Sequence, residues 1–332
     1  MVKRIRNWLF VCLVTLVLLA GWLAYYAIAP LKLQPSSQEV VIAPNSGLRS
    51  IANQLVTQGV LREPWRFVLL AKLLNKEQYL QAGSYTLNKN VSPYQLLLSL
   101  NYGKATQGSI TFIEGRTFAQ MREKLAKNDA VKQTINGLSD KEIMQLLGSP
   151  YNSPEGLFFP DTFYFNRHTT DIALLKISYD SMQTKLDRAW QNREEGLPYK
   201  NSYQALIMAS IIEKETGKAS ERPMIAGVFV NRMRLGMRLQ TDPTVIYGMG
   251  LQFNGNIRKK DLLTDTPYNT YTRNGLPPTP IAMPGIAAIE AALHPAKTKA
   301  LYFVGKGDGS HEFSNNLNEH NIAVVRFQLK KQ

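Results

Sequence analysis

An uncharged run of 22 residues, Trp8 to Ala29, sets the first constraint on how this 332-residue chain can fold. As a helix rising ~1.5 Å per residue, it would cover the ~30 Å hydrocarbon thickness of a bilayer. Three cations lie among the first six residues, whereas Lys32 alone follows the run closely. By the positive-inside rule, this asymmetry places the short N-terminus in the cytoplasm.

A cleaved signal peptide is the competing interpretation, because Ala27-Ile28-Ala29 has the small-x-small form of a cleavage site. The run is longer than the roughly 7 to 15 residues of a signal h-region, and Pro30 would follow the cut. We therefore predict a cytoplasmic tail at 1–7, a retained transmembrane helix at 8–29 and a polar tether at 30–39.

Composition indicates a folded protein with a positive field. Hydrophobic residues make up 44% and charged residues 19%, which excludes a disordered chain, and the formal net charge is +14. Such a charge favours polyanionic partners, or simply gives a basic surface. No nucleic-acid-binding motif appears, so we predict no nucleic-acid partner. The single cysteine, Cys12, excludes an intrachain disulfide.

Residues 40–107 are expected to form a small α+β module. Val40 to Ile42 and Ala82 to Leu87 are short β-type runs, and Leu48 to Leu55 places apolar residues on one helix face. Ser92-Pro93 is typical of a helix start. Further along, aromatics gather between Leu157 and Phe165, where core packing is a better interpretation than a sugar-stacking groove.

Tyr203 to Thr216 is the most informative predicted helix. It is apolar on nearly every face up to Ile212, so we expect it to be buried. Glu213 and Glu215 fall in its last turn, with Gly217 at a plausible C′ position. The helix dipole disfavours anions at that end, and apolar surroundings disfavour ionisation. At least one glutamate should therefore have a raised pKa, as a general acid requires.

Helical spacing helps to distinguish the two glutamates. Glu215 shares the face of Met208 and Ile211, whereas Glu213 points about 160° away on the 3.6-residue period. A plain capping or ion-pairing role in a solvated last turn remains an equal alternative for either residue. Spacing alone leaves that choice open.

Eight sequence blocks resemble the endolytic murein transglycosylases, a family of bacterial cell-wall enzymes. The blocks are Ile211–Thr216, Ser220–Arg222, Phe229–Arg232, Met237–Gly248, Tyr268–Tyr271, Gly275–Pro278, Ile281–Gly285 and His294–Ala296. The resemblance implies an α+β protein anchored in the inner membrane, with a LysM-like glycan-binding module at 40–107 and a catalytic domain at 108–332 outside the cytoplasm. It also assigns the catalytic glutamate to Glu215.

The implied reaction is non-hydrolytic cleavage of the bond between N-acetylmuramic acid and N-acetylglucosamine. One carboxyl protonates the glycosidic oxygen and then deprotonates the muramyl C6 hydroxyl, closing a 1,6-anhydro ring and limiting the length of nascent strands. A hydrolytic muramidase would need a second carboxylate, for which Asp242 or Glu213 are candidates. A non-catalytic, membrane-tethered glycan-binding scaffold is the alternative of a different class.

Other polar residues in these blocks are candidates for binding sugar hydroxyl and acetamido groups, although turn stabilisation explains each equally well. The candidate substrate-binding residues are Glu213, Asn231, Gln240, Asp242, Tyr247, Asn269 and Tyr271. The four histidines lack paired-ligand spacing, so we predict no metal site and no cofactor. The expected partners are glycan strands and the membrane, with glycan polymerases as a further hypothesis.

Overall fold

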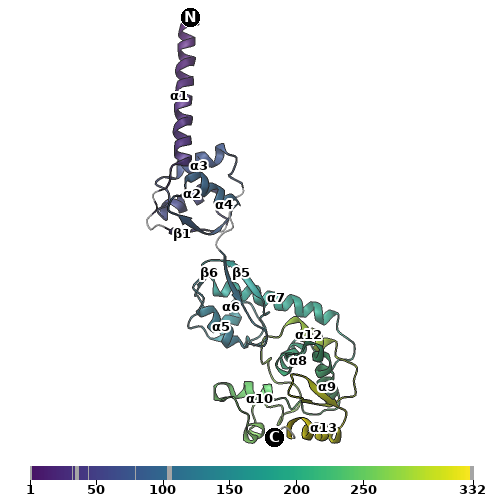
Figure 1. Cartoon of the computed structure of the whole chain (residues 1–332). Helices are drawn as coiled ribbons and strands as arrows, with labels where there is room; N and C mark the ends of the chain where they lie inside the picture. The colour runs from purple at the N-terminus through teal and green to yellow at the C-terminus, as the bar shows by residue number, and fades with distance from the viewer. Residues whose placement is uncertain are drawn as a thin grey trace. The chain divides into compact units, whose positions relative to one another are not determined.

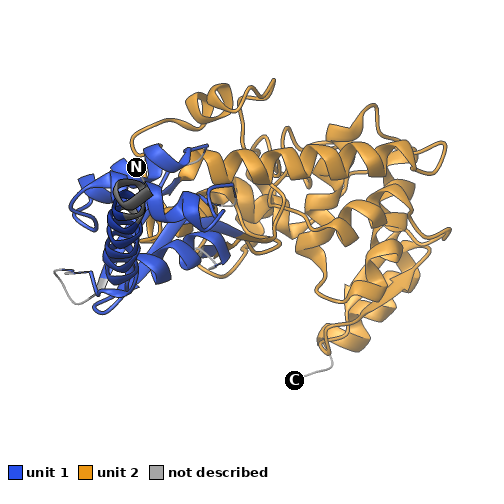
Figure 2. Cartoon of the chain, turned by 90° about the horizontal axis from the view of Figure 1, so that it is seen from above, with its two compact units in different colours: residues 1–109, 164–169 blue, residues 110–163, 170–332 orange. Residues whose placement is uncertain are grey.

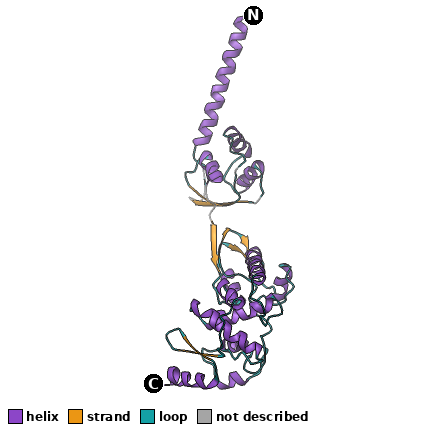
Figure 3. Ribbon diagram, turned by 90° about the vertical axis from the view of Figure 1, so that its right-hand side faces the viewer, coloured by secondary structure: helices purple, strands orange, loops and turns teal. Residues whose placement is uncertain are grey.

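The chain forms two compact units, one of residues 1–109 with 164–169 and the other of 110–163 with 170–332 (Figure 2). This computed structural model describes residues 2–31, 33, 37–43, 45–78, 80–102 and 107–329. Helices predominate and strands are short (Figure 3). The predicted α+β class is confirmed.

Helix α1 (Val2–Ile28) contains most of the uncharged run and begins the chain in Figure 1. Among the residues that the structure describes, no helix is both long enough and apolar enough to cross a membrane. The predicted transmembrane span at 8–29 is therefore not confirmed. Of the predicted tether at 30–39, residues 32 and 34–36 lie outside the described residues, and residues 37–39 belong to a strand rather than to a tether.

The first unit continues with an antiparallel pair of strands and three helices. Strand β1 (Ser37–Ile42) pairs with β2 (Gly83–Asn88), and Val40 lies opposite Tyr85. Helices α2 (Leu48–Thr57) and α4 (Pro93–Tyr102) occur where the apolar spacing and Ser92-Pro93 predicted them. Helix α3 (Pro64–Leu73) was not predicted, although Pro64 occupies its first turn as proline commonly does.

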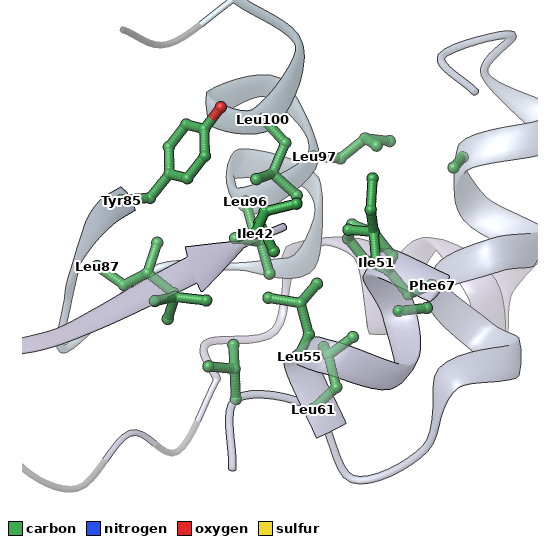
Figure 4. Packing of buried hydrophobic residues seen from close by; sticks show 14 of the residues in the cluster. Ile42, Ile51, Leu55, Leu61, Phe67, Tyr85, Leu87, Leu96, Leu97 and Leu100 are labelled. Atoms are coloured by element: carbon green, nitrogen blue, oxygen red, sulfur yellow. The ribbon is translucent and has the colours of Figure 1, made fainter. Parts of the chain in front are cut away.

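The core of this unit lies between the two strands and the helices (Figure 4). Ile42 from β1, Ile51 and Leu55 from α2, Phe67 from α3 and Leu96 from α4 are each at most 1% exposed. The apolar face predicted for α2 therefore points into the core, which confirms the inference from its periodicity.

The second unit is mainly helical. Its helices are α5 (Phe118–Ala126), α6 (Asp140–Leu146), α7 (Asp171–Gln191), α8 (Ser202–Glu215), α9 (Arg222–Arg234), α10 (Asp242–Met249), α11 (Lys259–Leu263), α12 (Ile286–Leu293) and α13 (Leu317–Val324). Besides the β1–β2 pair, the described residues form three two-stranded sheets, which pair β3 (Gln107–Thr111) with β5 (Thr162–Asn166), β4 (Val131–Lys132) with β6 (Thr169–Thr170), and β7 (Tyr302–Gly305) with β8 (His311–Ser314).

Helix α8 is the buried centre of this unit. Every residue from 205 to 212 is buried, and α7, α9 and α12 pack around the helix. This confirms the prediction from its apolar faces. Gly217 occupies the predicted C′ position, because Thr216 is the C-cap (φ −144°, ψ 133°), but Gly217 does not adopt the left-handed conformation that glycine often takes there. The chain turns sharply out of the helix directly after Glu215.

The aromatic run after Pro154 contributes mainly to the core. Leu157, Phe158 and Phe159 are buried, and the Phe158 ring stacks on Phe118 of α5 at 5.0 Å between centroids. Tyr164, at 71%, is exposed. Core packing was therefore the better interpretation of this run.

Candidate functional site

Glu215 occupies the last position of the buried helix α8. The helix is anchored at its other end by Asn201, whose side chain accepts a hydrogen bond from the backbone N–H of Gln204 at 3.0 Å. A cap of this kind satisfies an N–H group that would otherwise lack a partner. Glu215 itself is partly buried, and its Oε1 accepts a hydrogen bond from the Thr241 hydroxyl.

The surroundings of Glu215 favour its protonated form. Burial raises the pKa of Glu215 to about 7, and the nearby charge of Asp242 acts in the same direction. The Thr241 hydroxyl and the Arg232 guanidinium oppose this shift without cancelling it. A carboxyl with a pKa close to neutrality can both donate and accept a proton, as a single acid/base catalyst must.

Thr241 is held in place by a buried cluster of threonines. Its backbone N–H donates to the Thr270 hydroxyl at 3.0 Å, and the Thr244 hydroxyl donates to its carbonyl at 2.7 Å. The Thr244 and Thr270 hydroxyls are 2.9 Å apart. All three side chains are at most 2% exposed, so the partner of Glu215 has little freedom to move.

Arg232 places a buried cation in the electrostatic environment of Glu215. It is only 7% exposed, and it donates to the carbonyls of Leu301 at 2.6 Å and Leu239 at 2.8 Å. Its guanidinium also lies over the Tyr302 ring at 5.0 Å. These contacts fix a positive charge that forms no ion pair with a carboxylate among the described residues, and its field reaches Glu215.

Asp242 and Tyr271 form a second pair beside Glu215. Asp242 is the first residue of α10, and its Oδ1 accepts a hydrogen bond from the Tyr271 hydroxyl at 2.6 Å. Burial, followed by this bond to Asp242, raises the pKa of Tyr271, and the charge of Glu215 adds to the shift. Gln240 is exposed, has a left-handed backbone (φ 51°), and accepts from Arg232 at 3.3 Å.

Glu213 faces a different set of partners. Its Oε2 accepts from the Gly285 N–H at 3.0 Å, and its Oε1 lies 3.4 Å from the Arg222 guanidinium. Burial raises the pKa of Glu213, although the Gly285 N–H and Arg222 both oppose the shift. A side chain at Gly285 would collide with the carboxylate of Glu114, so the backbone at Gly285 packs closely against Glu114. Glu213 therefore ties α8 to its neighbours.

Two other candidate residues bind main-chain carbonyls. The Asn231 amide donates to Thr298 at 2.8 Å and Ala300 at 3.1 Å. The Asn269 amide, 1% exposed, donates to three carbonyls in the 261–264 turn, the nearest at 2.7 Å. These contacts match the turn-stabilising alternative. Asn231 also lines a cavity of about 720 Å³, but Glu215 does not.

Tyr247 donates its hydroxyl hydrogen to Glu155 at 3.1 Å. Sequence reasoning missed Glu155, a buried acid between a proline and a glycine, because no pattern there suggests chemistry. It also missed the roles of Thr241 and Arg232, although both lie within the blocks that resemble the family. Across the described residues, no group of histidine, cysteine and acidic side chains is arranged to hold a metal ion.

Comparison with known proteins decides the family. A family model described as YceG-like matches residues 40–326, which is most of the chain. The chain belongs to the YceG-like family. Its relatives include the endolytic murein transglycosylase of Bacillus subtilis (strain 168), 32% identical over 312 residues that cover 87% of this chain and 84% of that protein. The resemblance drawn from the sequence blocks is thereby confirmed.

Two further similar proteins extend the comparison. The endolytic murein transglycosylase of Streptococcus pneumoniae serotype 2 (strain D39) is 27% identical, and the match covers 86% of this chain and 57% of that protein. A crystal structure of a YceG-like protein from Listeria monocytogenes aligns with a TM-score of 0.54 at 28% identity, covering 86% of this chain and 98% of that one.

Removing the Thr241 hydroxyl should change the ionisation of Glu215. Thr241→Val deletes a donor that favours the carboxylate, so we expect the pKa of Glu215 to rise further. A hydrogen bond to a charged group contributes roughly 1.5 to 3 kcal/mol, so any activity that depends on Glu215 should fall about tenfold or more. Thr241→Ser keeps the hydroxyl and should retain most of that activity; equal losses in the two variants would exclude the hydroxyl as the cause.

Glu215→Gln should stabilise the protein at neutral pH. A carboxyl whose pKa is raised from 4.5 to about 7 binds protons more tightly in the folded state, so stability falls as pH rises through that window. The neutral variant avoids this loss, and its advantage should grow to at most about 3 kcal/mol above pH 7 and vanish below pH ~4.5. Thermal unfolding of both proteins from pH 4 to 8 measures the difference; a constant difference would contradict the shift.

Proposed function

We propose that this protein is an endolytic murein transglycosylase with Glu215 as its acid/base catalyst. The observation that supports this most directly is the partly buried carboxyl of Glu215, held by Thr241 and raised in pKa to about 7. Membership of the YceG-like family and the activity named for its relatives supply the substrate, the glycan strands of peptidoglycan.

The reaction needs one proton to move in each direction. Protonated Glu215 donates to the oxygen of the glycosidic bond between N-acetylmuramic acid and N-acetylglucosamine as that bond breaks. The resulting carboxylate then accepts the proton of the muramyl C6 hydroxyl, whose oxygen closes the 1,6-anhydro ring. Arg232 stabilises the carboxylate between the two steps, and the charge of Asp242 favours its reprotonation.

A hydrolytic muramidase is the second candidate, and Asp242 is the observation that favours it. Its carboxylate belongs to the electrostatic environment of Glu215, as a second carboxylate in a glycosidase would. Its Oδ1 also accepts a hydrogen bond from the Tyr271 hydroxyl at 2.6 Å, so that oxygen is already occupied and is less available to bind a water molecule. The lytic reaction therefore fits the site better.

The ends of the released products distinguish the two reactions. Purified peptidoglycan incubated with the protein should yield fragments ending in 1,6-anhydro-muramyl residues, and Glu215→Gln should reduce their release by about a hundredfold to ten-thousandfold, as the loss of an acid/base catalyst does. Mass spectrometry of the soluble products measures this. Release should also decline as pH rises through about 7, because the acid step needs protonated Glu215.

Glu213→Gln serves as the control for that experiment, since Glu213 lies on the same turn but binds Gly285 and Arg222. It should affect stability more than chemistry. Reducing ends instead of anhydro ends would establish the hydrolase. If peptidoglycan binds but no product depends on Glu215, the non-catalytic glycan-binding scaffold is the function that remains.

We further propose that the segment around Trp8 to Ala29 anchors the protein in the inner membrane, with the N-terminus in the cytoplasm and the chain that follows the segment outside it. The support is the uncharged run itself and the exposure of its large apolar side chains, including Phe10 at 67% and Leu16 at 66%. A row of exposed apolar side chains on a long helix is costly in water. Anchoring would keep cleavage near emerging strands, close to the glycan polymerases, while the 40–107 module binds glycan as LysM-like modules do.

Membrane extraction tests the anchor. The full-length protein should remain in the membrane pellet after washing at high salt and then at high pH, whereas a chain beginning at Leu31 should be soluble, because it lacks the apolar run. Added protease should digest the folded units only from the extracytoplasmic side. Release of the full-length protein by the high-pH wash would exclude an integral anchor.

A further inference from the structure

A second buried carboxyl lies in the catalytic unit outside the chemistry described above. Glu155, on the loop between α6 and β5, is 5% exposed. Its Oε1 accepts from the backbone N–H of Phe118 at the start of α5, and its Oε2 accepts from the hydroxyl of Tyr247 on α10, each at 3.1 Å. One side chain thus joins three segments that are far apart in the sequence.

The groups that face Glu155 leave its charge uncompensated. Tyr247 from α10, Tyr203 from α8 and Asp140 from α6 are its titratable neighbours, and within the described residues no lysine or arginine forms an ion pair with it. Burial raises the pKa of Glu155 to about 7, and Asp140 adds to the shift, although the bonds from Tyr247 and two backbone N–H groups oppose it.

Stability alone does not account for a carboxylate at this position. Burying an unpaired charge is costly, and a neutral amide could keep both contacts without that cost, by accepting from the Phe118 N–H with its oxygen and donating its own N–H to the Tyr247 hydroxyl oxygen. A charged acceptor differs in one respect, because a hydrogen bond to a carboxylate is about twice as strong as one to a neutral oxygen. The ionised form of Glu155 is therefore the state that holds α10 most firmly.

The position of Tyr247 connects this carboxyl with the catalytic one. Tyr247 lies six residues after Thr241, or about 9 Å along a helix axis. Thr241 donates to Glu215 just before α10 begins, and Tyr247 donates to Glu155 one and a half turns later. The Tyr247 ring also packs edge-on against Tyr268 at 4.8 Å. Helix α10 is thus held at two points, each by a carboxyl group.

The loop that carries Glu155 also contacts a segment that is hydrogen-bonded to α8. Gly156 adopts φ +78°, and a side chain there would collide with Pro280. The next residue, Ile281, donates its N–H to the Ser210 hydroxyl of α8 at 3.0 Å. Glu155 is therefore connected to the helix of Glu215 through this packed segment as well as through α10.

We propose that Glu155 is a positioning residue for Glu215: in its ionised form it binds Tyr247, fixes α10, and thereby holds Thr241 where it orients the catalytic carboxyl. This inference rests on the proposed function for its kinetic consequences. Protonation of Glu155 weakens the bond to Tyr247 and loosens α10. Activity should therefore decline on the acid side, opposite to the alkaline decline set by Glu215 itself.

Glu155→Gln in the full-length protein is the principal test, measured as release of soluble peptidoglycan fragments from pH 5 to 9. We expect kcat to fall about tenfold near pH 8, with KM changed less than twofold, and the acid-side decline to disappear because the titrating group is gone. Tyr247→Phe should give a similar loss, and the double variant should lose little more, since the two residues act as one unit.

Asp171→Asn is the matched control, because Asp171 is also fully buried and accepts backbone N–H bonds, from Thr134 at 2.9 Å and Ile135 at 3.1 Å. It should change the melting temperature and leave the shape of the pH profile as in the wild type. If Glu155→Gln has the same pH–activity profile and the same kcat as the wild type, the proposal is wrong. It is also wrong if the loss of activity in Glu155→Gln is no larger than the fraction of the variant that is unfolded.

Coupling between positions 155 and 215 gives a readout independent of activity. The melting temperatures of Glu155→Gln, Glu215→Gln and the double variant should be non-additive between pH 5 and 8, because loosening α10 changes the environment of Glu215. Additive shifts would overturn the positioning role even in an active enzyme. If the wild type releases no fragments, the proposed function fails, while this coupling still decides the role of Glu155.

Discussion

The contact between Thr241 and Glu215 is the interaction on which the arrangement of the candidate site in the second unit depends. Helix α8 is buried from 205 to 212, so its direction and depth are set by core packing, and the helix ends where the chain turns away at Thr216. Glu215, the last residue of α8, therefore lies next to the start of α10. The threonine cluster behind Thr241 then determines where the carboxyl points.

Electrostatics at this point balance two opposing demands. A catalyst that donates and then accepts a proton needs a pKa near neutrality, which burial supplies, but full burial would prevent ionisation altogether. Arg232 and the Thr241 hydroxyl limit the rise in the pKa of Glu215, whereas the charge of Asp242 adds to it. Because Arg232 is fixed by main-chain carbonyls rather than by a carboxylate, it stabilises the charged state of Glu215 without forming an ion pair that would lock it.

Several elements of the structure could be predicted from local patterns. The apolar face of α2, the helix start at Ser92-Pro93 and the buried α8 all follow from spacing along one segment. The last turn of α8 could be singled out because the helix dipole disfavours acidic residues at a helix C-terminus, and this turn contains two of them. The resemblance to the family was needed to choose Glu215 over Glu213. Helix α3 was missed, and Gly217 lies at the predicted C′ position without the left-handed conformation common there, while the C-cap Thr216 is extended.

The sequence by itself determined the α+β class, the family, the buried helix and the presence of Glu215 at the end of that helix. Each of these follows from patterns among residues that lie close together along the chain. Only the tertiary structure decided which groups surround that glutamate. Thr241 and Glu215 are 26 residues apart, and Tyr247 and Glu155 are 92 apart. Hydrogen bonds between residues so far apart in the sequence depend on how the helices pack, and the pKa of a side chain depends on the burial that results. A local sequence pattern therefore predicts neither these hydrogen bonds nor the pKa of Glu215.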